Sequence, residues 1–368
     1  FLLDDVGWMD VGFNGGGVGF VIANYCTRPE LKEISFDIVG EDIGKKHLLH
    51  DRFEADGFGV HYVTPKGKNL LRNISQMFRL MKKGHYDGVH VHFEEWSFLY
   101  LMIAWLCGIK LRVCHAHMAY MPGTDTKLHY RLFRVLLNYF ATERLACSKD
   151  AGKHLYGKHP YKILNNAIEA QQYRYDPVIR EKVRKSLGME DKLVIGVVGR
   201  LSFQKNPQMS LEILREIRRI RQDAVMLMIG TGELEDEVKK QIREYDLYDV
   251  VRLMGLRQDV PELLQAMDVF VLPSRFEGLG IVYVEAQAAG LYAFGTEGVV
   301  PEEVAVCPNL MKFIPKEHTA EQWAKAVLDI LPYEREITTH RIAEAGYDLS
   351  SEVQKLAGIY GMEGQRKQ

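Results

Sequence analysis

Two carboxylates stand out in residues 273–290, PSRFEGLGIVYVEAQAAG, because the rest of the stretch is almost entirely small or apolar. Glu277 and Glu285 lie eight positions apart in it. Glu285 falls within a run that predicts a buried helix, where an unpaired carboxylate is costly and needs hydrogen-bond donors. The vicinal hydroxyls of a ribose would supply two donors. The structural alternative is a helix in which one glutamate pairs with a neighbouring lysine.

The segment FEGLG, residues 276–280, is predicted to be the turn between a buried strand and this helix. Gly278 and Gly280 let the backbone approach a ligand closely, and Leu279 lies between them. The free N–H groups at the start of the helix form a site for an anion such as a diphosphate. The pattern therefore indicates a diphosphate at the turn, a ribose on the helix and a sugar beside Glu277.

Length and composition limit the class of protein. The chain has 368 residues, 47% hydrophobic and 26% charged, with a formal net charge of −2. This length predicts two domains, and the composition excludes a disordered chain and a strongly basic nucleic-acid-binding protein. The five cysteines include no C-x-x-C pair, which is typical of thiols in a reducing compartment. The most apolar run, residues 96–109, is shorter than the ~20 residues of a spanning helix, and no signal peptide is recognised. We therefore expect a cytoplasmic protein.

Short apolar runs alternate with helical segments along the chain. The strand candidates are residues 35–39, 59–63, 87–92, 112–117, 144–148, 193–198, 224–230, 250–255 and 268–274. Between them lie segments with apolar residues at helical spacing, such as 206–222 and 234–245. Continuous β-branched strands separated by helices favour parallel sheets covered on both faces. The predicted fold class is α/β, with two doubly wound, Rossmann-like domains facing each other across a cleft. Ligands in such sheets bind beyond the carboxyl ends of the strands.

The domain boundary is placed in the polar stretch 169–192, which interrupts the strand rhythm and is interpreted as a linker with one short helix. Residues 1–168 would form the acceptor-binding domain and residues 169–349 the donor-binding domain. A helix over about 350–368 would pack back on the first.

The chain resembles the family 4 retaining glycosyltransferases of the GT-B fold, and most closely those of bacterial exopolysaccharide and capsule synthesis. The segment FEGLGIVYVEAQAAG is similar to the E-x7-E signature of that family. The resemblance covers essentially the whole chain and is strong from about residue 85 onward. The other matching segments are VVGRLSFQKN (197–206), IGTGELED (229–236), MGLRQDVPELLQAMDVFVLPS (254–274), ILNNAIEAQQY (163–173), DGVHVHFEE (87–95) and VCHAHM (113–118).

The resemblance assigns roles to residues of the donor domain. It implies that Glu285 holds the ribose, that Glu277 contacts the donor sugar, and that backbone around Leu256 and Arg257 holds the base. The remaining donor-binding candidates are Gly199, Gly230, Gly232 and Glu233.

Two cations, Arg200 and Lys205, lie at the end of a predicted strand and the start of a helix. There they could neutralise the charge that develops as the diphosphate leaves. We therefore expect no metal and no cofactor, and no cluster in the sequence has metal-ligand spacing.

The N-terminal half contributes weaker candidates. His117 ends the predicted strand RVCHAH and resembles the family histidine that contacts the donor sugar or the acceptor, whereas His92 and His115 are more often structural in such positions. A glycine run, Gly15, Gly16 and Gly17, could approach donor phosphates, although the alternative is a flexible loop.

Basic residues cluster around apolar helices between residues 61 and 170. They are Lys66, Lys68, Arg72, Arg79, Lys82, Lys83, Lys127, Arg131 and Arg134. Such helices could lie on the inner face of an anionic membrane, or could simply be solvated faces of packed helices.

The sequence thus predicts a retaining, metal-independent glycosyltransferase. It would move a sugar from a nucleotide-diphosphate sugar, with a UDP-sugar favoured, to a saccharide or lipid-linked acceptor. Two alternatives stay open: a UDP-sugar epimerase or GT-B enzyme with a soluble acceptor, and a catalytically silent sugar-nucleotide-binding protein.

Overall fold

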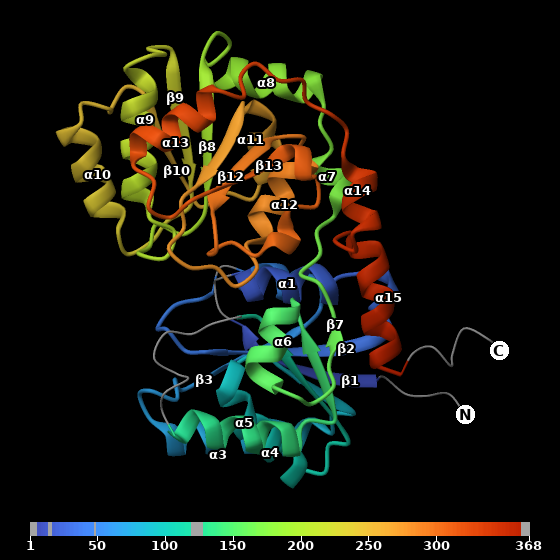
Figure 1. The fold of residues 1–368 in the computed structure, drawn as a ribbon. Helices are drawn as coiled ribbons and strands as arrows, with labels where there is room; N and C mark the ends of the chain where they lie inside the picture. The colour runs from blue at the N-terminus through green and yellow to red at the C-terminus, as the bar shows by residue number, and fades with distance from the viewer. Residues whose placement is uncertain (1–5, 14–16, 48, 119–127, 362–368) are drawn as a thin grey trace. The chain divides into compact units, whose positions relative to one another are not determined.

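The computed structural model describes residues 6–13, 17–47, 49–118 and 128–361 and divides the chain into two units (Figure 1). Unit 1 comprises residues up to Ala167 together with those from Leu349 onward, and unit 2 comprises Ile168–Asp348. The chain therefore leaves unit 1, forms unit 2 and returns. Where it leaves and returns, Ile168 N donates to Tyr347 O at 2.9 Å.

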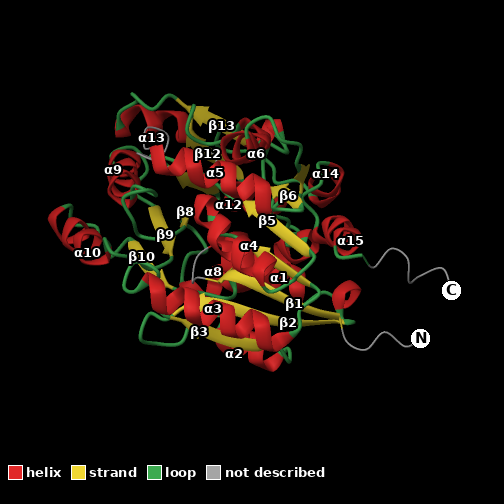
Figure 2. Ribbon diagram, turned by 90° about the horizontal axis from the view of Figure 1, so that it is seen from below, coloured by secondary structure: helices red, strands yellow, loops and turns green. Residues whose placement is uncertain are grey.

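Among the described residues of unit 1, seven parallel strands form a sheet in the order β3-β2-β1-β4-β5-β6-β7 (Figure 2). They are β1 (Val6–Phe13), β2 (Ile34–Glu41), β3 (Gly59–Val63), β4 (Gly88–Val91), β5 (Leu111–Ala116), β6 (Glu143–Ala146) and β7 (Lys162–Ile163). The order changes direction between β1 and β4, which pair with each other although β2 and β3 separate them along the chain. Parallel sheets bind ligands at such a switch point.

Helices connect the strands of unit 1. They are α1 (Gly17–Cys26), α2 (His50–Ala55), α3 (Leu70–Gly84), α4 (Ser97–Leu106), α5 (Leu128–Phe140) and α6 (Lys149–Tyr156), with 3-10 turns η1 (Pro29–Leu31) and η2 (Glu94–Trp96). Helices α3, α4 and α5 pack side by side. Asn69 begins α3 as a side-chain cap, because its Oδ1 accepts from Arg72 N at 3.0 Å.

The last described helix, α15 (Leu349–Ile359), completes the core of unit 1. Its Val353 and Leu356, with Tyr360 just beyond it, are buried together with α1 and β2. Glu352 is also buried and accepts from Asn165 N at 3.0 Å, so the helix is held by a polar contact as well as by apolar packing.

Among the described residues of unit 2, six parallel strands form a sheet in the order β10-β9-β8-β11-β12-β13. They are β8 (Leu193–Val198), β9 (Ala224–Ile229), β10 (Val251–Gly255), β11 (Val269–Leu272), β12 (Tyr292–Thr296) and β13 (Met311–Ile314). Helices α9 (Pro207–Arg218), α10 (Glu235–Glu244), α11 (Val260–Ala266), α12 (Ile281–Ala288), α13 (Ala320–Leu328) and α14 (Thr339–Glu344) accompany them. Here the switch point lies between β8 and β11, which are neighbours in the sheet.

The stretch 169–192 is not the linker with one short helix that we predicted. It forms two helices of unit 2, α7 (Ala170–Tyr173) and α8 (Pro177–Leu187). Arg180 and Arg184 of α8 pair with Asp268 at 2.5 and 3.1 Å, so α8 is tied to the start of β11. The sequence offered only the charges, and their partner lies more than eighty positions away.

Within the described residues, no helix combines the length and apolar character needed to cross a bilayer.

Candidate donor site

Lys205 and Glu277 form a buried ion pair at the switch point of unit 2. Lys205 Nζ lies 2.7 and 2.9 Å from the two carboxylate oxygens of Glu277, and Ser274 Oγ donates to Oε1 at 2.6 Å. The side chain of Glu277 is only 3% exposed, so without these donors its charge would be strongly destabilising. The pair joins the loop after β8 to the turn after β11, as predicted for a site at the carboxyl ends of these strands.

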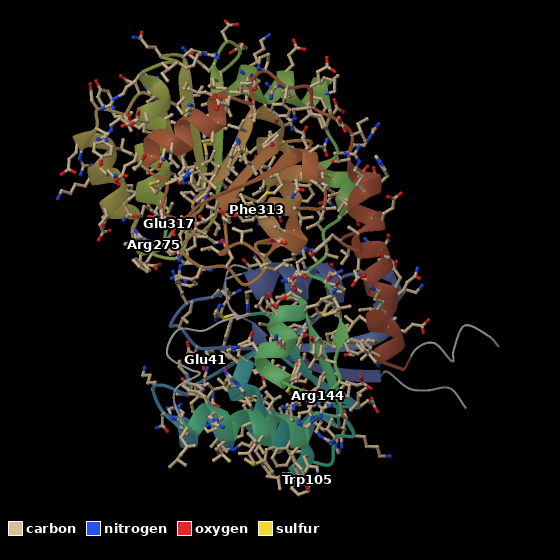
Figure 3. The ribbon with its side chains drawn as sticks, viewed as in Figure 1. Glu41, Trp105, Arg144, Arg275, Phe313 and Glu317 are labelled. Carbon is tan, nitrogen blue, oxygen red and sulfur yellow. The ribbon has the colours of Figure 1, made fainter. Side chains whose placement is uncertain are left out.

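The two loops are joined by further contacts. Arg275, labelled in Figure 3, donates to Asn206 Oδ1 at 2.9 Å, and its guanidinium lies over the ring of Phe203. Gln204 donates from its side chain to Phe276 O at 3.0 Å. These contacts hold Lys205 and Glu277 in a fixed relation before any ligand binds.

Helix α12 begins at Gly280, whose φ of +78° lies in the left-handed region. A Cβ at this position would lie 2.9 Å from the ring of Tyr283, so both the backbone conformation and the space favour glycine. No side chain of the described residues caps this helix, and Tyr283 N donates to Gly280 O at 3.0 Å, so the N–H groups of Ile281 and Val282 are the ones available to an anion. Leu279 is buried, so only its backbone could contribute to that site, and Gly278 precedes it in the turn.

Glu285 lies one turn into α12 and is largely buried. Burial raises the pKa of its carboxyl to about 7, while a hydrogen bond from Tyr173 and the charge of Lys205 act in the opposite direction. The pKa of Tyr173 is itself raised well above its ordinary value, first by burial and then by Glu285. Lys205 therefore acts on both glutamates of the motif.

The glycines after β8 and β9 let two loops approach each other. Gly230 has a φ of +130°, and a Cβ there would lie 2.0 Å from Gly199 O. A Cβ on Gly232 would lie 2.2 Å from Leu201 O. Leu201 N in turn donates to Thr231 O at 3.1 Å. Close backbone packing therefore requires glycine at these positions, in addition to the predicted contact with a nucleotide.

Arg200 and Glu233 form an exposed ion pair at the rim of these loops. Arg200 Nε lies 3.0 Å from Glu233 Oε2, and the two side chains are 71% and 53% exposed. Such a pair contributes at most about 1 kcal/mol, so an arriving anion could displace Glu233 at little cost. After β10, Leu256 is half exposed and Arg257 pairs with Asp259.

His117, the catalytic candidate of unit 1, belongs to a buried column of imidazoles. Its Nε2 lies 2.7 Å from His92 Nδ1, and its backbone N donates to Glu94 Oε1 at 2.8 Å. Burial and the neighbouring His92 lower the pKa of His117 well below its usual value. Burial lowers the pKa of His115 in the same direction. The role of His117 in transfer stays a prediction.

Of the glycine run, Gly15 and Gly16 lie outside the described residues, and Gly17 is the first residue of α1. The strand before this run is β1, which contains the buried Asp10.

The sequence missed several residues that the structure brings to these sites. Ser274 and Tyr173 bind the two glutamates of unit 2, and Glu94 binds the backbone of His117. Burial raises the pKa of Glu94 to about 8. A hydroxyl three positions before Glu277 was the available signal for Ser274. Tyr173 offered none, because it lies on a segment that we had interpreted as a linker.

Comparisons with known proteins show which proteins this chain is similar to. Residues 179–349 match the family model "Glycosyl transferases group 1". EpsF of Bacillus subtilis (strain 168), a protein assigned as a glycosyltransferase, is 26% identical over 95% of this chain and 94% of its own. The UDP-Gal:alpha-D-GlcNAc-diphosphoundecaprenol alpha-1,3-galactosyltransferase of Escherichia coli is 30% identical over 60% of each chain. The crystal structure of Anabaena HepE with UDP and glucose covers 97% of this chain and 99% of its own, with a TM-score of 0.79 at 18% identity.

Two Rossmann-like units of this kind define the GT-B fold, which the HepE structure shares. Residues 179–349 match the group 1 glycosyltransferase family, and the chain is accordingly a glycosyltransferase.

Proposed function

We propose that this glycosyltransferase transfers a sugar, with retention and without a metal, from a UDP-sugar to a saccharide or lipid-linked acceptor in exopolysaccharide synthesis. The observation that carries the proposal is the Lys205–Glu277 pair with Glu285 beside it. A cation paired with one carboxylate and acting on a second, next to a helix start without a side-chain cap, matches the three parts of a sugar nucleotide. The UDP-Gal-dependent galactosyltransferase acting on a diphosphoundecaprenol-linked sugar supports the choice of donor and acceptor class.

In this proposal each residue has one task. Glu285 accepts from the ribose hydroxyls, and the start of α12 receives the diphosphate. Lys205 and Arg200 neutralise the diphosphate as the bond from its oxygen to the anomeric carbon breaks. The acceptor hydroxyl attacks from the same face, and its proton passes to the departing phosphate. Glu277, held by Lys205 and Ser274, orients the donor sugar.

The test is titration calorimetry with UDP, GDP and ADP, followed by an assay of nucleotide release from the matching sugar nucleotide. We expect UDP to bind, and Glu285→Gln to weaken binding at least tenfold. Glu244→Gln, an exposed glutamate at the end of α10, is the matched control. NMR of the product gives the anomeric configuration, and an assay with chelator tests metal independence.

Three results would contradict the proposal. Binding of none of the nucleotides would show that the donor site is wrong. Binding without nucleotide release in the presence of saccharide or lipid-linked acceptors would favour the silent binding protein. Conversion of the sugar nucleotide to its epimer would favour the epimerase.

We further propose that unit 1 contacts an anionic membrane surface through α5. Leu128, Leu132, Val135 and Tyr139 lie on one face of this helix and are 78, 54, 65 and 75% exposed. Trp105, at the end of the neighbouring α4, is 51% exposed and projects from the outer side of unit 1 (Figure 3). An apolar stripe of this kind on the surface of a helix is typical of interfacial binding.

Lys127 lies outside the described residues, and the other basic residues divide into two groups. Arg79, Lys82 and Lys83 on α3 and Arg131 on α5 are exposed, as membrane contact requires. Lys66 instead pairs with Glu41 at 2.9 Å, and Arg134 pairs with Glu95 at 2.8 Å. These two cations make ion pairs within unit 1 and are not assigned to membrane contact.

Vesicle co-sedimentation tests the membrane proposal. We expect binding to vesicles with anionic lipid, and loss of that binding in Leu132→Ser/Val135→Ser. Ile220→Ser, which removes an equally exposed apolar side chain from unit 2, is the control. Equal sedimentation of all three proteins would contradict the proposal.

A further inference from the structure

Three histidine rings of unit 1 come together from two neighbouring strands. His90 belongs to β4, His92 follows it and His115 belongs to β5. One ring nitrogen from each lies within 4.8 Å of the other two, and all three side chains are buried. The register explains the grouping, because His90 pairs with Val113 and position 92 is therefore level with His115.

The hydrogen bonds of two of these rings fix which nitrogen is available. His90 Nδ1 lies 2.8 Å from the Tyr360 hydroxyl, and His92 Nδ1 lies 2.7 Å from His117 Nε2. Within the described structure, the Nε2 atoms of His90 and His92 make no hydrogen bond. A histidine that binds a metal through one nitrogen commonly donates its other N–H to a neighbour, which fixes ring and tautomer. Donation from Nδ1 to Tyr360 and His117 leaves both Nε2 lone pairs available to an ion.

His115 is the third ring. Neither of its nitrogens makes a hydrogen bond of good geometry in the described structure, although the backbone of Leu164 lies close by. The residue is only 1% exposed, so bulk solvent does not supply the missing partner. Buried polar groups are nearly always satisfied, and a ring nitrogen left this way points to a ligand.

Asp10 of β1 lies beside this group next to His92, although its carboxylate is not within 4.8 Å of all three histidine ligand atoms. Its Oδ1 lies 3.1 Å from His92 Nε2, yet the two atoms are not aligned for a hydrogen bond. Two ligands of one tetrahedral zinc ion lie about 3.4 Å apart, which is close to this distance. Asp10 and the three histidines also line a cavity of about 10 Å³, roughly the space that one water or ion occupies.

We propose that Asp10, His90, His92 and His115 bind a divalent first-row metal of the zinc class. Three imidazole nitrogens and one carboxylate oxygen suit this class of ion, and binding it requires the side chains to move closer together. Four protein ligands leave no open position, which is the pattern of a structural site. The ion would join β1, β4 and β5, and through the His90–Tyr360 bond it would also hold the residue that follows α15. This site goes beyond the proposed transfer chemistry, which is assigned no metal, and does not depend on it.

Metal content and cobalt spectroscopy of the full chain test the site. We expect about one zinc-class ion per chain in protein purified without added chelator. After chelation and addition of Co²⁺ alone, we expect the visible ligand-field bands of tetrahedral cobalt and a higher midpoint of thermal unfolding. Folded wild-type protein that contains no metal and gives no such bands would overturn the proposal, whatever the variants do.

The variants locate the ion. His115→Gln and Asp10→Asn should lose the bands and bind Co²⁺ at least about a hundredfold more weakly, since even outer-shell changes cost tenfold to a hundredfold. His159→Gln removes an exposed histidine of unit 1 and should change nothing. His50→Gln tests a second group, His50 with Asp51 and Glu54, which is mostly exposed. Bands that survive His115→Gln and disappear in His50→Gln would assign the metal to that group and overturn the proposal.

Discussion

At the proposed donor site, Glu285 should couple nucleotide binding to a proton, because its carboxyl has a pKa of about 7 and the ionised form is the better acceptor for ribose hydroxyls. Binding should therefore release a proton near neutral pH. Affinity for UDP should rise with pH up to about 7 and fall by up to about tenfold for each pH unit below it.

Calorimetry in buffers of different ionisation enthalpy measures the released proton. Protons can also be released by the phosphate of the nucleotide, and that contribution is the same in wild type and in Glu285→Gln. The wild type should therefore release more protons than Glu285→Gln, and the difference is the contribution of Glu285. Equal proton release in both proteins would contradict the assignment.

The same carboxyl makes stability depend on pH. Its pKa is higher in the folded chain than in the unfolded chain, so the folded state binds more protons between about pH 4.5 and 7. Stability should fall as pH rises through that window, by at most roughly 3 kcal/mol. Denaturant unfolding of unit 2 at several pH values should show this fall in the wild type and not in Glu285→Gln. A slope that is unchanged by the substitution would show that other groups cause it.

Lys205 and Glu277 should behave as one unit. Removing Lys205 leaves Glu277 buried and unpaired, and breaking such a pair costs about 3–5 kcal/mol. Lys205→Met should therefore destabilise unit 2 more than the double variant Lys205→Met/Glu277→Leu, while both variants should lose transfer activity. Denaturant unfolding gives the coupling energy. Additive effects would show that the two charges do not depend on each other.

At the scale of the elements, the loops after β8 and β9 depend on Gly230. Gly230→Ala would place a Cβ 2.0 Å from Gly199 O, and backbone cannot move aside as a side chain can. We expect a loss of several kcal/mol in stability and of donor affinity. Gly188→Ala is the control, because Gly188 also has a positive φ but its Cβ would meet nothing within 4 Å. It should cost only about 1 kcal/mol. Similar losses in both variants would mean that conformation, not contact, explains Gly230.

The strands of unit 2 differ in how well the sequence predicts them. Residues 193–198 were predicted as a strand and form β8, because an unbroken apolar run has few other interpretations. β12 (YAFGT) and β13 (MKFI) were missed, since glycine, threonine and lysine interrupt their pattern. In unit 1, β7 has only two residues, too few to give a pattern.

The donor site was predictable to the extent that it is local. Glu277, Gly280 and Glu285 belong to one turn and one helix, so spacing alone brings them together. The bond between Tyr173 and Glu285 joins segments more than a hundred positions apart, and the histidine group required the pairing of β4 with β5. No rule of sequence spacing predicts the Tyr173–Glu285 contact or the grouping of the three histidines, so neither was expected from the sequence.

At the scale of the whole molecule, α15 should hold unit 1 together. Deleting residues 349–368 would expose apolar side chains that include Val353, Leu356 and Tyr360, each contributing about 1.5–3 kcal/mol. We expect unit 1 to become sensitive to protease while unit 2 stays resistant, as mapped by limited proteolysis and mass spectrometry. Deleting only 362–368 is the control. Equal resistance of both units after the longer deletion would contradict this role.

The return of the chain to unit 1 at Leu349 also sets an order of events on the ribosome. Domains usually fold as they emerge, the N-terminal one first. Here all residues of unit 2 have been synthesised at Asp348, while the core of unit 1 still lacks Val353, Leu356 and Tyr360. The half that is translated first is therefore the half that matures last, and until then its open core is a natural client for chaperones.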